Sequence, residues 1–294
     1  MFEPKAQNPT LAAMLIVGAT AFIAAATLLA KLLGTDTLGP GLHPLQISHG
    51  RFVFAFTAIA GAALIVRPPI IRPHWGLHIG RTMFGWMGVT LMFASVAVIP
   101  MADATAISFL NPVFAMILAI PLLGETVGRI RWSAAAIALI GALILLRPTP
   151  GSFQPGALLA LAAAGAMGME LIFIKKIAGR ERVFQILIIN NMIGVGISSA
   201  AVWPVWQMPT TPQWGALVAL GLVMVGAQTL FVHAMARADA SYVAPFSYAT
   251  LIFAAAYDFG WFGVLPDGVT MLGAGIILGG AAMLAWREGR LRRK

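Results

Sequence analysis

Long apolar runs recur along this chain, separated by short connections that carry helix-breaking residues such as Gly39-Pro40 and Pro68-Pro69. Most of these runs approach or exceed the roughly 20 apolar residues that a helix needs to cross the hydrocarbon core of a bilayer. There are ten of them, at residues 11–33, 45–66, 80–99, 103–123, 131–147, 155–177, 183–203, 213–236, 240–262 and 267–286. The pattern predicts an all-α membrane protein with ten transmembrane helices and no soluble domain.

The first run could be taken for a cleaved leader, because Lys5 precedes it and Ala24-Ala25-Ala26 lies inside it. The apolar segment of a secretory signal is only about 7–15 residues long. Here the run continues to Leu33, which is long enough to span a bilayer. We therefore expect a membrane helix at this position.

Composition agrees with a chain that is surrounded by lipid. Hydrophobic residues make up 60% of the 294 residues and charged residues 10%, against about 25% charged in ordinary soluble domains. The net charge of +9 does not indicate nucleic-acid binding, because the basic residues are scattered over short connections and one tail. The absence of cysteine excludes disulfides, thiolate catalysis and cysteine-ligated metal centres. We expect no cofactor, no bound metal and no nucleic-acid partner.

The basic residues also predict the orientation of the chain. If the N-terminus is cytoplasmic, 16 of the 19 basic residues fall in cytoplasmic connections or the C-terminal tail, and only Arg147 falls on the opposite side. Lys31 and Arg51 lie within helices. Such an excess of Lys and Arg marks the cytoplasmic face of membrane proteins. It predicts a multi-pass protein of the bacterial inner membrane with both termini in the cytoplasm.

Short motifs recur in the same order in the two halves of the chain. Met101-Ala102-Asp103-Ala104-Thr105 opens the fourth run, and Arg237-Ala238-Asp239-Ala240-Ser241 opens the ninth. Trp75-Gly76 and Trp214-Gly215 precede the third and eighth runs. The pattern predicts two related five-helix repeats, residues 1–150 and 151–294. Because five is odd, the second repeat must be inverted in the membrane, an arrangement that many transporters use for alternating access to a midplane site.

Polar side chains inside the runs are candidates for function, because they are costly in a bilayer. Glu170 is the only acid well inside an apolar stretch. It could bind a substrate ammonium group, carry a proton or serve as a structural carboxyl. Arg51 and Asp258 share an outer depth and could form an ion pair. Asn111-Pro112 predicts a kinked or broken helix, since proline removes a backbone hydrogen bond, and Pro245 lies one turn earlier in the ninth run by the alignment of the repeats.

The motifs as a set resemble a known family. Asp103-Ala104-Thr105, Asn111-Pro112-Val113-Phe114 and Leu123-Gly124-Glu125, within ten predicted helices, are similar to the EamA-type drug/metabolite transporter (DMT) superfamily. Within it the chain most resembles the bacterial exporters of aromatic and other neutral amino acids. The second half departs from the pattern, with Gly263-Val264 in place of an acid and Tyr248 in place of a proline.

The resemblance implies a central cavity surrounded by the first four helices of each half, with the fifth and tenth helices outside it. The candidate substrate contacts are then Trp86, Asn111, Glu170, Asn191, Gln228, Ser247 and Tyr248. Glu170 would accept the ammonium group of an amino acid, the amides would bind its carboxylate, and the aromatic residues would contact its side chain. The resemblance thus implies a secondary transporter that exports small metabolites, above all amino acids, by alternating access. The alternatives are a DMT carrier for another metabolite or drug, or a membrane-embedded enzyme.

An enzyme would need clustered chemistry such as HExxH, which the five histidines do not provide. His74 and His78 lie in a basic segment and are interpreted as topology anchors. Phosphorylated substrates would favour several buried cations, and only Arg51 qualifies in the sequence. Gly275-Ile276-Ile277-Leu278-Gly279 can pack the tenth helix against the bundle or against a second copy, so we expect a monomer or a weak homodimer.

Overall fold

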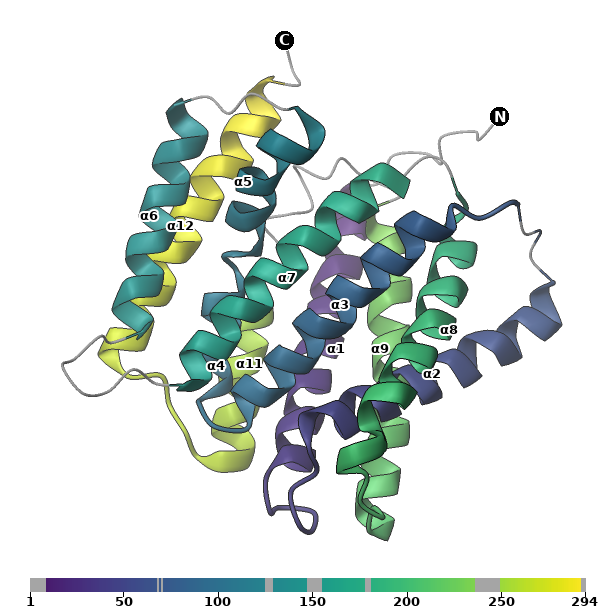
Figure 1. The fold of residues 1–294 in the computed structure, drawn as a ribbon. Coiled ribbons are helices and arrows are strands. Elements are labelled where there is room, and N and C mark those ends of the chain that lie inside the picture. The colour runs from purple at the N-terminus through teal and green to yellow at the C-terminus, as the bar shows by residue number, and fades with distance from the viewer. Residues whose placement is uncertain are drawn as a thin grey trace.

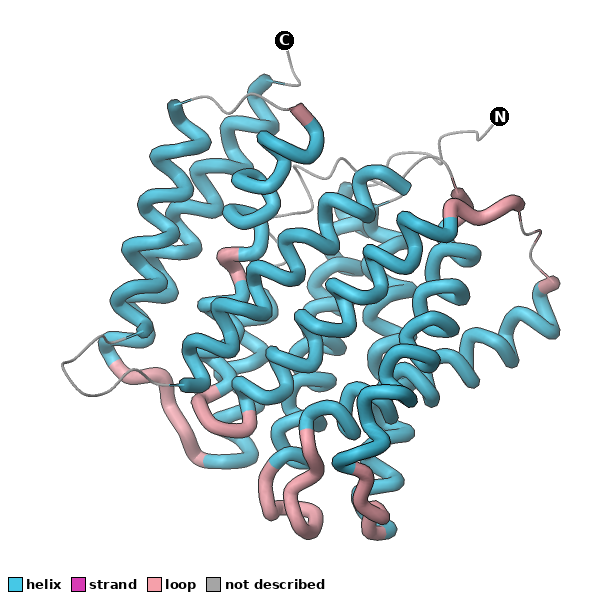
Figure 2. Tube along the Cα trace, in the orientation of Figure 1, coloured by secondary structure: helices cyan, strands magenta, loops and turns pink. Residues whose placement is uncertain are grey.

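The computed structural model describes residues 9–67, 69, 71–124, 129–146, 155–177, 181–235 and 249–291. Within these ranges every regular element is a helix (Figure 2). In chain order they are α1 (Pro9–Gly34), α2 (Pro44–Val66), α3 (Trp75–Val96), α4 (Met101–Ser108), α5 (Asn111–Leu123), α6 (Arg129–Leu146), α7 (Pro155–Ile177), α8 (Val183–Val202), the short 3₁₀ helix η1 (Trp203–Val205), α9 (Thr211–Met235), α11 (Ala249–Phe262) and α12 (Gly268–Leu291). The prediction of an all-helical chain is confirmed.

Six stretches of the described chain are long and apolar enough to cross a membrane. They are α1, α2, α4 together with α5, and most of α7, α8 and α9. The apolar parts of α11 and α12 are shorter. The chain is therefore a multi-pass membrane protein, while the number of ten crossings stays a prediction.

The fourth predicted run is broken into two helices at its centre. α4 ends at Ser108, Phe109 and Leu110 form a turn, and α5 begins at Asn111. Pro112 has no backbone N–H and cannot continue a hydrogen-bonded helix. The break predicted from Asn111-Pro112 is confirmed, and it leaves irregular backbone in the middle of a membrane span. In the ninth run, Pro245 lies outside the described residues.

Small residues let α3 and α7 approach closely. A Cβ atom added to Gly88 would lie 2.8 Å from Cγ of Met167, and one added to Gly85 would lie 2.8 Å from Cδ of Glu170. Because each glycine leaves room for a large side chain of the opposite helix, the two helices pack closely, and the partly buried Glu170 side chain lies against Gly85. α1 and α9 also pack along each other.

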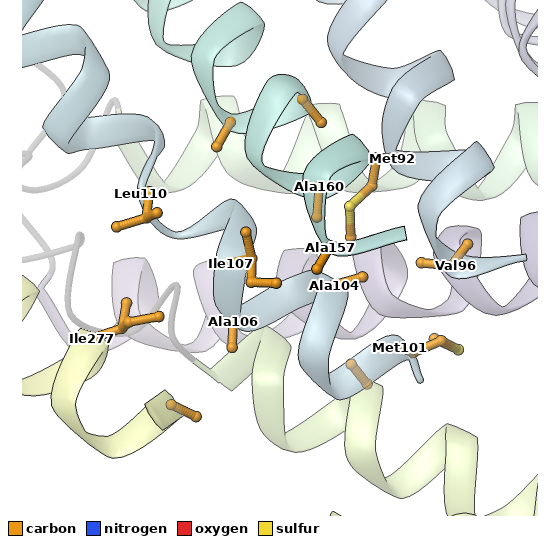
Figure 3. Packing of buried hydrophobic residues seen from close by; sticks show 14 of the residues in the cluster. Met92, Val96, Met101, Ala104, Ala106, Ile107, Leu110, Ala157, Ala160 and Ile277 are labelled. Carbon is orange, nitrogen blue, oxygen red and sulfur yellow. The ribbon is translucent and has the colours of Figure 1, made fainter. Parts of the chain in front are cut away.

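Two helices stand at one edge of the bundle. α6 and α12 pack mainly against each other (Figure 1), and a Cβ atom on Gly141 of α6 would lie 2.7 Å from the backbone oxygen of Gly273 in α12. The broken helix joins this pair to the rest. Figure 3 shows Ile107 of α4 and Leu110 of the break beside Ile277 of α12 and Ala160 of α7 in one apolar cluster.

The bundle has two ends, which we name by a carboxylate at each. At the Asp258 end, α1 and α11 finish and α4 begins, because Asp258 contacts both Lys31 and the backbone of Met101. At the Glu181 end, Glu181 contacts His74, directly before α3. The first turn of α1 and the last turn of α12 both lie at the Glu181 end (Figure 1).

Candidate functional site

A cavity of about 380 Å³ lies in the middle of the bundle. Its volume falls within the range of about 300–1,000 Å³ that is typical of small-molecule sites. Eight of the described helices supply its lining, which consists of Ile16, Thr20, Ile23, Ala26 and Thr27 of α1, Arg51 of α2, Val89, Met92 and Phe93 of α3, Thr105 and Ser108 of α4, Asn111 of α5, Met167 of α7, Met224 and Phe231 of α9, Thr250 of α11, and Phe109 of the break. The broken helix therefore opens onto the cavity.

Most of the lining is apolar and aromatic, and several of its hydroxyl groups already have partners. Thr20 donates to the backbone oxygen of Val17 at 2.7 Å, and Ser108 donates to that of Thr105 at 2.7 Å. Arg51 is the only charged residue in the described lining. The cavity thus combines an apolar surface with one cation.

The Arg51 guanidinium is buried and has unused donors. Arg51 is 4% exposed, and neither Nε nor Nη1 has a hydrogen-bond partner among the described residues. The guanidinium carbon lies 4.3 Å from the centre of the Phe52 ring, a cation–π contact that partly compensates for lost hydration. A buried charge normally has a counter-ion with direct hydrogen bonds, which Arg51 lacks in the described structure.

Glu170 lies near a second buried arginine. Arg81 Nε is 3.7 Å from Glu170 Oε1, and Arg81 Nη1 donates to the backbone oxygen of Ile186 at 3.4 Å. The Glu170 carboxylate also attracts Arg51 electrostatically. One carboxylate therefore serves two guanidinium groups, one from α3 and one from α2.

Arg81 was missed by the sequence analysis, which placed it in the basic connection before α3. In the structure it is 9% exposed and lies within α3. The signal was weak, because α3 begins five residues before the apolar run predicted from position 80. The expectation that Arg51 is the only arginine buried in the bundle is therefore wrong, although Arg81 does not line the cavity.

The predicted contact residues do not all line the cavity. Asn111 does, whereas Trp86, Glu170, Asn191 and Gln228 are absent from its described lining. Trp86 Nε1, Asn191 Oδ1 and Gln228 Oε1 are nevertheless buried without a hydrogen-bond partner in the described structure. Ser247 and Tyr248 lie outside the described residues.

The expected pairing of Arg51 with Asp258 is wrong. Asp258 Oδ1 lies 2.5 Å from Lys31 Nζ, and Asp258 Oδ2 accepts the backbone N–H of Met101 at 2.8 Å. Lys31 lies in the last turn of α1, at the same end of the bundle as Asp258. Nearby, Thr270 donates to Asp103 at 2.6 Å. These contacts tie α1, α4, α11 and α12 together at the Asp258 end.

A second carboxylate ties the opposite end. Glu181 Oε1 accepts the backbone N–H of His74 at 2.8 Å and contacts its Nδ1 at 3.0 Å, and Oε2 contacts Nε2 of His78 at 2.7 Å. Burial acts to raise the pKa of Glu181, but the hydrogen bonds from His74 and His78 outweigh it and lower the pKa to about 2. His74 and His78 therefore hold a carboxylate, a role that the sequence analysis did not foresee, while their role as topology anchors stays a prediction.

The fold and the cavity define the class of protein, which is a multi-pass helical membrane protein with a central cavity of small-molecule size. The model of the EamA-like transporter family matches residues 10–147 and 154–286. The chain belongs to the EamA-like transporter family, and the resemblance given by its motifs is confirmed. It is a small-molecule transporter rather than an enzyme.

Several relatives are named for what they carry. The chain is 27% identical over 260 residues to an S-adenosylmethionine uptake transporter of Rickettsia bellii, which covers 87% of this chain and 89% of the relative. It is 32% identical over 229 residues to a riboflavin transporter of Rhizobium johnstonii, with 76% and 75% covered. It is 26% identical over 200 residues to the pseudopaline exporter CntI of Pseudomonas aeruginosa, with 67% and 70% covered. These names do not support the expected amino-acid specificity.

A solved crystal structure is also similar in fold. It superposes with a TM-score of 0.65 at 21% sequence identity and covers 96% of this chain and 99% of the other. At this identity the likeness concerns the fold alone. Two proteins of nearly equal extent therefore share one helical architecture.

Proposed function

We propose that this chain is a secondary transporter of the bacterial inner membrane that moves a small metabolite by alternating access through the central cavity. The observation that carries the proposal is the cavity itself. Eight helices line it, and two of them, α4 and α5, are the parts of the broken helix. Interrupted helices in transporters mark the substrate site, because the freed backbone groups can contact the substrate. The polar contacts at both ends of the bundle are the groups that would separate when either side opens.

The proposal includes an inverted pair of repeats, residues 1–150 and 151–294. Separate matches of the family model to the two parts of the chain support it. So does a pair of glutamines that the spacing of the Trp-Gly motifs aligns. Gln46 in the first turn of α2 accepts the backbone N–H of Gln207, and Gln185 in the first turn of α8 accepts that of Ile71. Each glutamine thus binds a connection of the other half: Gln46 binds the one before α9, and Gln185 binds the one before α3.

The proposed orientation places both chain ends in the cytoplasm. The shared position of the first turn of α1 and the last turn of α12 supports an even number of crossings. The bias of basic residues supports the cytoplasmic assignment. Because the chain has no cysteine, single cysteines at position 5 and position 290 can be labelled in intact cells. Both should react only after the membrane is permeabilised, and labelling of one end alone in intact cells would refute the inverted repeat.

For the substrate we propose a neutral amino acid with an apolar or aromatic side chain as the first candidate. The apolar lining, with Phe93, Phe109 and Phe231, suits such a side chain. Glu170 and the unpartnered amide oxygens of Asn191 and Gln228 are acceptors for an ammonium group. Because they lie outside the described lining, the substrate would meet them only as the cavity changes shape during transport. The names of the relatives favour S-adenosylmethionine and riboflavin as alternatives.

Uptake into liposomes tests the proposal. Purified protein is reconstituted and offered labelled phenylalanine, S-adenosylmethionine and riboflavin, each with and without an imposed pH gradient. A Thr27→Trp variant fills part of the cavity from α1 and should abolish uptake. Leu143→Trp on the exposed face of α6 should leave uptake unchanged. Equal uptake by wild type and Thr27→Trp would show that the cavity is not the route.

A further inference from the structure

The charges around the cavity do not balance. Arg51 and Arg81 are two buried guanidinium groups, and Glu170 is the acid that lies near both of them, so it can neutralise only one. Lys31 and Asp258 pair with each other at the Asp258 end and do not change this balance. One positive charge is therefore left in the apolar interior, where an uncompensated ion is costly.

Geometry shows which of the two arginines carries the excess. Arg81 has the Glu170 carboxylate at 3.7 Å and donates to the backbone of Ile186. Arg51 makes neither kind of contact within the described chain, and two of its buried nitrogens, Nε and Nη1, are unpartnered, against Nε alone in Arg81. Arg51, unlike Arg81, also borders the cavity. The unused donors thus belong to the guanidinium that a bound molecule can reach.

We propose that Arg51 is the receptor for a carboxylate group of the substrate, while Glu170 stays close to Arg81. The inference rests on the proposed transport function and adds a substrate class: organic acids with an apolar or aromatic body. A guanidinium binds a carboxylate through two parallel hydrogen bonds from neighbouring N–H groups, and the unpartnered Nε and Nη1 are donors on two different edges of Arg51. The body of the substrate then lies against Met92, Phe93 and Phe231.

Charge balance favours a monoanion over a phosphate. A carboxylate neutralises the single excess charge, whereas a phosphate that carries between one and two negative charges at neutral pH leaves a surplus in a dry interior. A substrate whose only charge is positive meets repulsion from the same group. Glu170 competes with the bound carboxylate for Arg51, since it attracts both arginines.

Binding to the purified protein in lipid nanodiscs tests the inference with matched probes. The probes are 3-phenylpropionate, its neutral amide 3-phenylpropionamide, and phenyl phosphate. Calorimetry should show that the wild type binds the acid at least tenfold more tightly than the amide, because the amide cannot form the charged pair. The phosphate should bind more weakly than the acid. Equal binding of acid and amide, no binding of either, or tighter binding of the phosphate would overturn the proposal.

Variants separate Arg51 from a merely structural role. Arg51→Gln should remove the preference for the acid, and Arg51→Lys should keep part of it because the charge remains without the two-pronged geometry. Glu170→Gln should bind the acid more tightly than the wild type, since the competing carboxylate is gone. Arg129→Gln, an exposed residue at the start of α6, is the matched control and should behave as the wild type. An unchanged acid preference in Arg51→Gln would refute the proposal even if Arg51→Lys fails to fold.

Different results would refute the proposed transport function and the proposed carboxylate site. If Thr27→Trp abolishes uptake but Arg51→Gln carries carboxylates as before, the cavity is the route and Arg51 is not the receptor. If Thr27→Trp has no effect, the proposed route itself is wrong.

Discussion

The Asp258 end and the Glu181 end of the bundle are held together by different chemistry. At the Asp258 end a buried lysine meets a carboxylate that also accepts a backbone N–H at the start of α4. At the Glu181 end a carboxylate accepts a backbone N–H and contacts two histidine rings and Gln185. The first arrangement is an ion pair between a lysine and an aspartate, and the second joins one glutamate to two imidazole rings and an amide.

The difference teaches what each end needs in order to open. Separating Lys31 from Asp258 leaves two charges that must be hydrated, so water has to reach the Asp258 end as it opens. Separating Glu181 from His74 and His78 leaves one carboxylate at the Glu181 end of the bundle. The neighbouring residues Arg182 and His74 are already exposed to solvent there. Three expected effects, from the largest to the smallest, test this comparison.

Removing the charge of Asp258 should have the largest effect. Asp258→Asn leaves Lys31, which is 8% exposed, buried without its counter-ion, and breaking a buried pair in this way costs about 3–5 kcal/mol. The double variant Lys31→Met/Asp258→Asn removes both charges and should recover much of the stability. Unfolding in detergent, followed by circular dichroism, measures both. A single variant as stable as the wild type would contradict a tightly paired Asp258 end.

Replacing Glu181 should have a smaller effect that depends on pH. Glu181→Gln is expected to cost about 1–3 kcal/mol, because the buried His78 ring and the backbone N–H of His74 lose a charged acceptor. The pKa of Glu181 in the folded chain, about 2, lies below its ordinary value of 4.5. The charged form therefore stabilises the folded chain, and this contribution is complete above the ordinary pKa and lost as the pH falls through the folded one.

The measurement is the difference in unfolding temperature between wild type and Glu181→Gln at a series of pH values. From pH 7 down to the ordinary pKa of 4.5 it should stay nearly constant as far as Glu181 is concerned, and it should shrink between there and about 2. Asp36 lies exposed in the connection after α1, and Asp36→Asn serves as a control that should show no such dependence. If the difference disappears well above pH 4.5, the pKa of Glu181 in the folded chain is not lowered, and its contacts with His74 and His78 do not stabilise the charged form.

The two aligned glutamines should give the smallest effects and the sharpest comparison. Gln46→Ala removes contacts of 2.6 and 3.0 Å to the backbone of Gln207, and Gln185→Ala removes one of 2.8 Å to Ile71 and one of 2.7 Å to Glu181. Each loss is expected to cost about 1 kcal/mol.

Accessibility then separates the two ends. A cysteine in place of the buried Ser198 reports on the Asp258 end, and one in place of the buried Thr82 reports on the Glu181 end. Gln46→Ala should speed the reaction of Cys reporters only at position 198, and Gln185→Ala only at position 82. If either variant exposes both positions equally, the ends do not open separately.

Much of the fold could be predicted from the pattern along the chain. The apolar runs match the described helices to within a few residues, and Asn111-Pro112 marked the break that lines the cavity. Both features are local, since helix length and a missing proline N–H depend on neighbouring residues alone.

The candidate site was harder to predict, because its residues come from separate helices. Glu170 was a candidate from its isolation in an apolar run, yet its neighbour Arg81 looked like part of a basic connection. Lys31 and Asp258 are far apart in the sequence and pair only because α1 and α11 end side by side. The depth of a residue in the membrane can be counted along its helix. The sequence does not show which face of that helix contacts which neighbouring helix.

By itself the sequence determined that this protein spans a bilayer, where most of its helices lie to within about five residues, and where the fourth span breaks. Those properties follow from hydrophobicity and backbone chemistry, which act over a few residues at a time. Only the tertiary structure decided which carboxylate each buried cation meets and which guanidinium is left without one. Ion pairing falls off with distance in space, so it is set by the packing of helices from opposite ends of the chain.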